Sequence, residues 1–77
     1  MEEQNTLLVD GVAIVVLSDK TGNWKKDTVE IYDPEDDLAN SRIASLVNYI
    51  YEEGYIADRR TQVNVIDREG NARKFKS

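Results

Sequence analysis

The chain of 77 residues contains no cysteine and no histidine, and only one proline and four glycines. Without cysteine, disulfide frameworks, thiolate metal sites and cysteine nucleophiles are excluded. Without histidine, the chain lacks the commonest general base and the commonest transition-metal ligand. The glycines never stand in the spacing of a phosphate-binding loop. We therefore expect no catalytic residues, no cofactor and no metal site, and predict that the protein is not an enzyme.

Long apolar segments are also missing. The longest apolar run covers residues 12–17, far short of the roughly 20 residues of a membrane-spanning helix. The chain opens with Met1, Glu2 and Glu3, which do not form the basic start of a secretory signal. These features predict a cytoplasmic protein with no membrane partner. With 40% hydrophobic and 32% charged residues, the chain is expected to fold as one domain over residues 1–77, with a frayed end at residues 1–5.

The charge is acidic overall but unevenly placed. The formal net charge is −5, which disfavours nucleic acid as a partner. Residues 1–53 carry twelve acids and four bases, whereas residues 54–77 carry three acids and six bases. The acids Glu35, Asp36 and Asp37 form the densest cluster, and we expect them to face a partner protein with a basic surface.

A helix is the clearest predicted element. Asp33 is a carboxylate suited to an N-cap, Pro34 suits the first helical position, and Gly54 is a typical helix-ending residue. These signals predict a helix over residues 34–53. Steps of 100° per residue place one apolar stripe toward the core: Ala39, Ile43, Leu46, Val47 and Ile50.

Four strands are predicted around the helix, at residues 12–17, 28–32, 62–66 and 72–76, from β-branched or alternating apolar residues. Two similar stretches, 18–23 and 66–71, combine Asp and Gly as in hairpin turns. Asp10 and Gly11 form either a two-residue hairpin turn or a bulge beside a short extra strand. The predicted fold is α+β, a single domain in the order β-β-α-β-β. Its antiparallel sheet has four or five strands, and one helix crosses one face.

One side of the predicted helix carries candidate partner-binding residues. Ala44, Asn48 and Tyr51 lie away from the apolar stripe, and Tyr55 follows just beyond the helix. Tyrosine is enriched at protein interfaces because it buries a large area at a low entropy cost. The alternative that Tyr51 lies flat on the surface of a monomer stays open. The partner is either another protein or a second copy, which would make a homodimer.

The sequence therefore predicts a small, acidic, non-enzymatic protein-binding module. Its size and acidity suit an inhibitor or accessory factor of the phage or mobile-element type, which occupies the surface of its partner. The alternative is a single-stranded nucleic-acid-binding module. In that case Trp24, Lys25 and Lys26 would act together with the basic residues of the last strand, 72–76.

Overall fold

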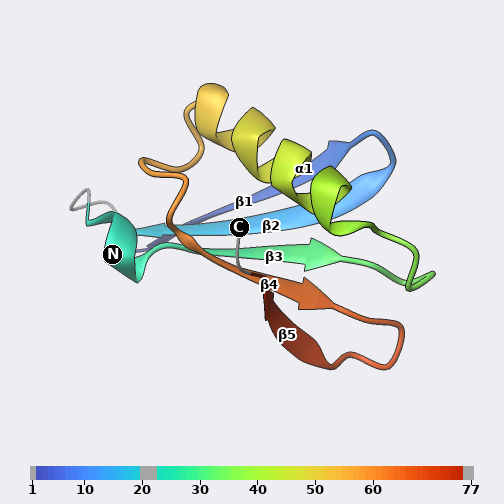
Figure 1. Cartoon of the computed structure of the whole chain (residues 1–77). Coiled ribbons are helices and arrows are strands. Elements are labelled where there is room, and N and C mark those ends of the chain that lie inside the picture. The colour runs from blue at the N-terminus through green and yellow to red at the C-terminus, as the bar shows by residue number, and fades with distance from the viewer. Residues whose placement is uncertain (1, 20–22, 76–77) are drawn as a thin grey trace.

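The computed structural model describes residues 2–19 and 23–75, which form five strands, one α-helix and one short 3₁₀-helix (Figure 1). In chain order these are β1 Glu2–Val9, β2 Val12–Asp19, η1 Trp24–Lys26, β3 Thr28–Tyr32, α1 Asn40–Glu52, β4 Gln62–Ile66 and β5 Ala72–Phe75. Lys25 and Lys26 thus lie in η1, before β3. Among the described residues, no helix is long and apolar enough to cross a membrane.

The strands form one mixed sheet in the order β1-β2-β3-β4-β5. β3 and β4 are parallel, and the other neighbouring pairs are antiparallel. The α+β class is confirmed, but the antiparallel sheet and the order β-β-α-β-β are wrong, because the order is β-β-β-α-β-β. Parallel neighbours need a long crossover connection, and α1 supplies it between β3 and β4.

The hairpin at the N-terminal end accounts for the extra strand. β1 pairs with β2 along its whole length, from Glu2 opposite Asp19 to Val9 opposite Val12. Residues 2–5, for which the sequence predicts fraying, lie within this paired strand. Asp10 and Gly11 both have positive φ values, 50° and 81°, as a two-residue type I′ hairpin turn requires. Of the two alternatives at this position, the hairpin turn is correct and the bulge is wrong.

The helix begins later than its sequence predicts, at Asn40 instead of Pro34. The carboxylate of Asp33, with only 4% of the residue exposed, accepts hydrogen bonds from the backbone N–H groups of Asp37 (3.0 Å) and Leu38 (3.2 Å). Asp36 has a φ of 52°, which lies outside the right-handed helical region. Asp33 therefore stabilises a loop before the helix. The N-cap of α1 is Ala39, which makes no side-chain capping bond.

The end of the helix agrees with its prediction. Gly54 has a φ of 87°, and its N–H donates to the carbonyl of Tyr51 at 3.1 Å. The N–H of Tyr55 donates to the carbonyl of Ile50 at 3.0 Å. This pair of bonds is the Schellman motif, which a left-handed glycine allows.

The two predicted hairpin turns have different outcomes. Between β4 and β5, the N–H of Gly70 donates to the carbonyl of Asp67 at 3.0 Å, and Gly70 has a φ of 84°. The turn predicted within 66–71 is confirmed. The turn predicted at 18–23 involves residues 20–22, which lie outside the described residues.

The core lies between α1 and one face of the sheet (Figure 1). Alternate residues of β2, β3 and β4 point toward the helix, and the helical stripe meets them. The predicted stripe is confirmed for Ile43, Leu46, Val47 and Ile50, whereas Ala39 is exposed. In the described part of the chain no helix covers the other face of the sheet. The buried apolar residues are Val12, Ile14, Val16, Val29, Ile31, Ile43, Leu46, Val47, Ile50, Ile56, Val63 and Val65.

Candidate functional site

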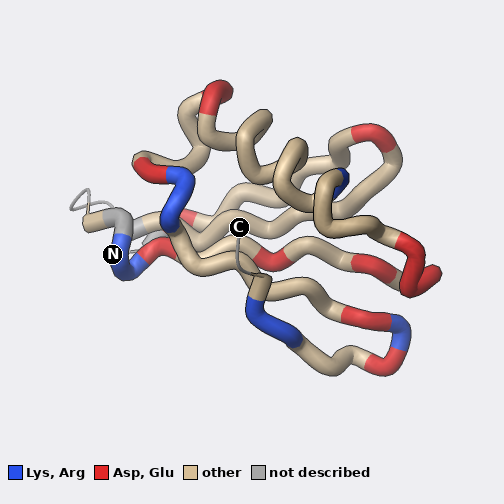
Figure 2. The backbone as a smooth tube through the Cα atoms, in the orientation of Figure 1, with Lys and Arg blue, Asp and Glu red and all other residues tan. Residues whose placement is uncertain are grey.

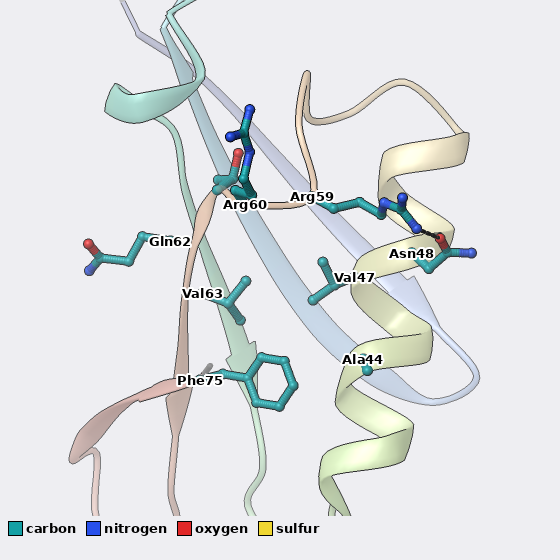
Figure 3. Close-up of a pocket in the computed structure, with 9 residues that line it drawn as sticks. Ala44, Val47, Asn48, Arg59, Arg60, Gln62, Val63 and Phe75 are labelled. Carbon is teal, nitrogen blue, oxygen red and sulfur yellow. Dashed lines mark hydrogen bonds between the residues drawn. The ribbon is translucent and has the colours of Figure 1, made fainter. Parts of the chain in front are cut away.

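A groove of about 490 Å³ lies between α1 and the strands β4 and β5, and we call it the α1–β4 groove. Its apolar floor comes from the helix and from the sheet, because Val47, Val63 and Phe75 converge there and Ala44 lies beside them (Figure 3). Phe75 reaches the floor because β5 pairs it with Val63. The polar residues that complete the lining are Asn48, Arg59, Arg60, Thr61 and Gln62.

Arg59 provides the cation at the rim of this groove. Its Nη1 donates to Oδ1 of Asn48 at 3.4 Å, the bond drawn in Figure 3. Its Cζ lies 5.4 Å from the centroid of the Tyr51 ring, within the range of a cation–π contact. Asn48 Nδ2 in turn donates to Glu52 Oε1 at 3.4 Å. The guanidinium is therefore positioned by two helical side chains, although both contacts are solvent-accessible and individually weak.

The neighbouring Arg60 has a different environment. Its Nε and Nη2 donate to the two carboxylate oxygens of Asp58 at 3.0 and 2.8 Å. The backbone N–H of Arg60 also donates to Asp58 Oδ1, at 2.8 Å. Hydrogen bonds from the Arg60 side chain and backbone lower the pKa of Asp58 from 3.8 to about 2. Arg60 is thus paired, whereas Arg59 forms no ion pair with any residue of 2–19 or 23–75.

Thr61 follows Arg60 in the chain and immediately precedes β4. The residue is 4% exposed, and its buried Oγ1 has no hydrogen-bond partner among the described residues. Buried hydroxyl groups are satisfied in most proteins. Thr61 belongs to the groove lining, but its Oγ1 is buried beneath the groove surface and is not open to a bound group.

The structure brings three of the predicted partner-binding residues together. Ala44 and Asn48 line the α1–β4 groove, and Tyr51, which is 39% exposed, is joined to it through Arg59. Tyr55 does not continue this row. It is half-buried against the core, and its carbonyl accepts a bond from Ser18 Oγ at 3.3 Å.

The predicted acidic cluster is separate from the groove. Glu35, Asp36 and Asp37 are exposed in the loop between β3 and α1, and Figure 2 shows this loop as a red segment at the N-terminal end of the helix. The basic segments of the chain just before β4 and within β5 are blue in Figure 2 and lie away from this loop. The molecule therefore has an acidic end and a more basic groove region.

Sequence reasoning missed Arg59 and Phe75 as parts of the site. Arg59 stands in an irregular connection, where periodicity gives no orientation, and Phe75 reaches the helix only through the pairing of β5 with β4. The excess of bases in residues 54–77 was the available signal. In the residues that the structure describes, no cluster of His, Cys, Asp or Glu could hold a metal ion. No protein-family model, curated protein or solved structure matches this chain.

Proposed function

We propose that the protein is a small, non-enzymatic protein-binding module whose binding site is the α1–β4 groove. The observation that carries this proposal is the combination of an apolar floor with a guanidinium at the rim, which two helical side chains contact and which forms no ion pair within residues 2–19 and 23–75. The groove volume, about 490 Å³, lies within the range of sites that hold a small ligand or a few side chains.

The groove chemistry selects one class of partner segment. Val47, Val63 and Phe75 favour an apolar side chain, whose transfer from water supplies most of the binding free energy. Arg59 favours a carboxylate, because charge-assisted hydrogen bonds are the stronger ones. The bound segment is therefore an extended stretch of another protein with an apolar residue next to Asp or Glu. An inhibitor or accessory factor would act by occupying its partner in this way.

The nucleic-acid alternative has less support from the fold. Its proposed aromatic and basic residues lie in η1, which precedes β3 in the chain, and in β5, and β4 lies between β3 and β5 in the sheet. A single-strand platform needs its aromatic and cationic groups side by side. A gel shift with single-stranded oligonucleotides at low salt tests this alternative, because phosphate binding weakens steeply as salt rises.

Selection from a random peptide display library tests the proposal without a known partner. We expect the wild-type protein to enrich peptides in which an apolar residue stands next to an acid. Replacing Arg59 with Gln, or Tyr51 with Ala, should weaken binding of a selected peptide by at least about tenfold, a typical effect at the centre of an interface.

The chain provides matched controls for both variants. Arg68→Gln removes a cation that donates to the Pro34 carbonyl at 3.4 Å, outside the groove lining. Tyr49→Ala removes a tyrosine that is 46% exposed but lies near Leu8 and Val9 of β1. Both controls should bind as the wild type does. Enrichment of Lys- and Arg-rich peptides, or unchanged binding by Arg59→Gln and Tyr51→Ala, would contradict the proposal.

A further inference from the structure

The outer edge of β1 is a second surface with a defined hydrogen-bonding pattern. β1 has eight residues and stands at one end of the sheet. No strand pairs with its outer edge in the described ranges 2–19 and 23–75. An edge strand presents a row of unpaired N–H and C=O groups, which can pair with another strand.

The two edges of this sheet are protected very differently. β5 is only four residues long and carries Arg73 and Lys74, and short length and positive charge both discourage edge pairing. In β1, residues 4–9 include no charged residue and no proline, and the strand pairs with β2 without a bulge. Leu8 is 76% exposed. From Gln4 to Val9 the β1 edge thus lacks the charges, proline and bulges that keep an edge strand unpaired, and its only charged residues are Glu2 and Glu3 at one end.

We propose that β1 pairs with β1 of a second copy of this chain, antiparallel, around a two-fold axis at Thr6. A strand paired antiparallel with itself about its centre is self-complementary, as a two-fold interface requires. Thr6 then lies opposite Thr6 of the second copy, Leu8 opposite Gln4, and Leu7 opposite Asn5. The two five-stranded sheets join into one continuous sheet, with both helices on the same face.

The hairpin turn supports this register. In an antiparallel hairpin with a two-residue turn, the pair next to the turn is hydrogen-bonded, and such pairs then alternate with non-hydrogen-bonded ones. Val9 and Val12 are the pair next to the turn. Gln4, Thr6 and Leu8 therefore direct their N–H and C=O groups to the outer edge. The register centred on Thr6 places all three in hydrogen-bonded pairs.

The centre of this edge carries no charge that would oppose a second copy. Each chain carries a net charge of −5, which opposes association through its acidic surfaces. Residues 4–8 are uncharged, so the five central pairs of this register bring no like charges together. At its two ends the register places Glu3 opposite Val9 and Glu2 opposite the turn residue Asp10. Threonines opposite each other are a favourable cross-strand pair. The neutral centre of β1 is therefore a place where two copies can pair without repulsion.

Sedimentation of the full chain over a range of concentrations tests the proposal. We expect a reversible monomer–dimer equilibrium for the wild type. The exposed side chain of Thr6 alternates with Leu7, so Thr6→Lys leaves the core unchanged and places two ammonium groups opposite each other at the axis. Self-association should weaken by at least about tenfold, since like charges directly opposite are destabilising.

Placing opposite charges at position 6 of two chains tests whether Thr6 of one copy lies opposite Thr6 of the other. Thr6→Lys and Thr6→Glu should each be monomeric, and an equimolar mixture of the two should form a heterodimer. Ala72→Lys adds the same charge at an exposed position of β5, outside the groove lining, and should dimerise as the wild type does. Circular dichroism confirms that each variant is folded. A wild type that is monomeric at all concentrations, a dimer that resists Thr6→Lys, or a mixture that stays monomeric would each overturn the proposal.

Discussion

At the scale of single residues, Asp58 determines which arginine can serve the groove. It forms a bidentate pair with Arg60, and this pair leaves Arg59 to contact Asn48 and Tyr51. Two adjacent arginines thus have different roles because one of them has a carboxylate two residues before it. Because Arg60 donates hydrogen bonds to Asp58, the pKa of the Asp58 carboxyl group reports whether this pair forms.

The pKa of Asp58 should be about 2 in the folded protein, below its ordinary value of 3.8, because Arg60 donates hydrogen bonds to its charged form. A carboxyl group with a lowered folded-state pKa stabilises the fold above its unfolded-state pKa. That contribution is lost as the pH falls from 3.8 through about 2. Titration of the Asp58 carboxyl carbon by NMR measures this value directly.

Two substitutions separate the causes of this shift. Arg60→Gln should raise the pKa of Asp58 only part of the way toward 3.8, because the backbone N–H of residue 60 still donates to Oδ1. Arg59→Gln should change it much less, since Arg59 is the smallest contributor. An Asp58 that titrates at its ordinary value in the wild type would show that the pair with Arg60 does not persist in solution.

At the scale of elements, the loop from β3 to α1 depends on Asp33. The side chain is buried and accepts two backbone N–H bonds, so Asp33→Ala leaves two donors without an acceptor. The expected loss is about 2–3 kcal/mol in the free energy of unfolding. Asp33→Asn keeps one acceptor oxygen and should lose less. Urea unfolding followed by circular dichroism measures both losses.

Glu35→Ala is the matched control in the same loop. Glu35 is exposed, and surface substitutions of this kind usually change stability by less than about 0.5 kcal/mol. If Asp33→Ala is no more destabilising than Glu35→Ala, the carboxylate does not hold the loop, and another interaction must account for the helix start at Asn40.

Local signals in the sequence predicted the elements well. The stripe of Ile43, Leu46, Val47 and Ile50 follows from helical periodicity, and the helix end follows from the backbone freedom of Gly54. The predicted helix start was wrong because an Asp side chain can cap either a helix or a loop. In the structure, the left-handed Asp36 and the hydrogen bonds from Asp37 and Leu38 to Asp33 form a loop.

The pairing of strands that are far apart in the sequence could not be predicted from the sequence. The parallel neighbours β3 and β4 are joined by a crossover, whereas the local pattern of each strand reads the same in a parallel or an antiparallel pair. For the same reason the α1–β4 groove could not be predicted as a unit. Ala44 and Asn48 were found from the helix surface, but Phe75 joins them only through the register of β5 against β4.

At the scale of the whole molecule, the two proposed surfaces lie at opposite ends of the sheet. The α1–β4 groove is formed with β4 and β5, whereas the second copy would pair with β1, and β2 and β3 lie between them. No residue of the groove lining belongs to β1. Distant sites without shared partners usually behave additively. Peptide binding and dimerisation should therefore be independent, and a dimer should bind two peptides.

This independence can be measured with variants already described. Thr6→Lys should bind a selected peptide with wild-type affinity in isothermal titration calorimetry, at one peptide per chain. Arg59→Gln should sediment with the wild-type dimerisation constant. If Thr6→Lys weakens peptide binding or Arg59→Gln weakens dimerisation, the two surfaces are coupled through the sheet. Each variant removes one interaction only. Thr6→Lys should therefore lose the dimer and keep peptide binding, whereas Arg59→Gln should lose peptide binding and keep the dimer.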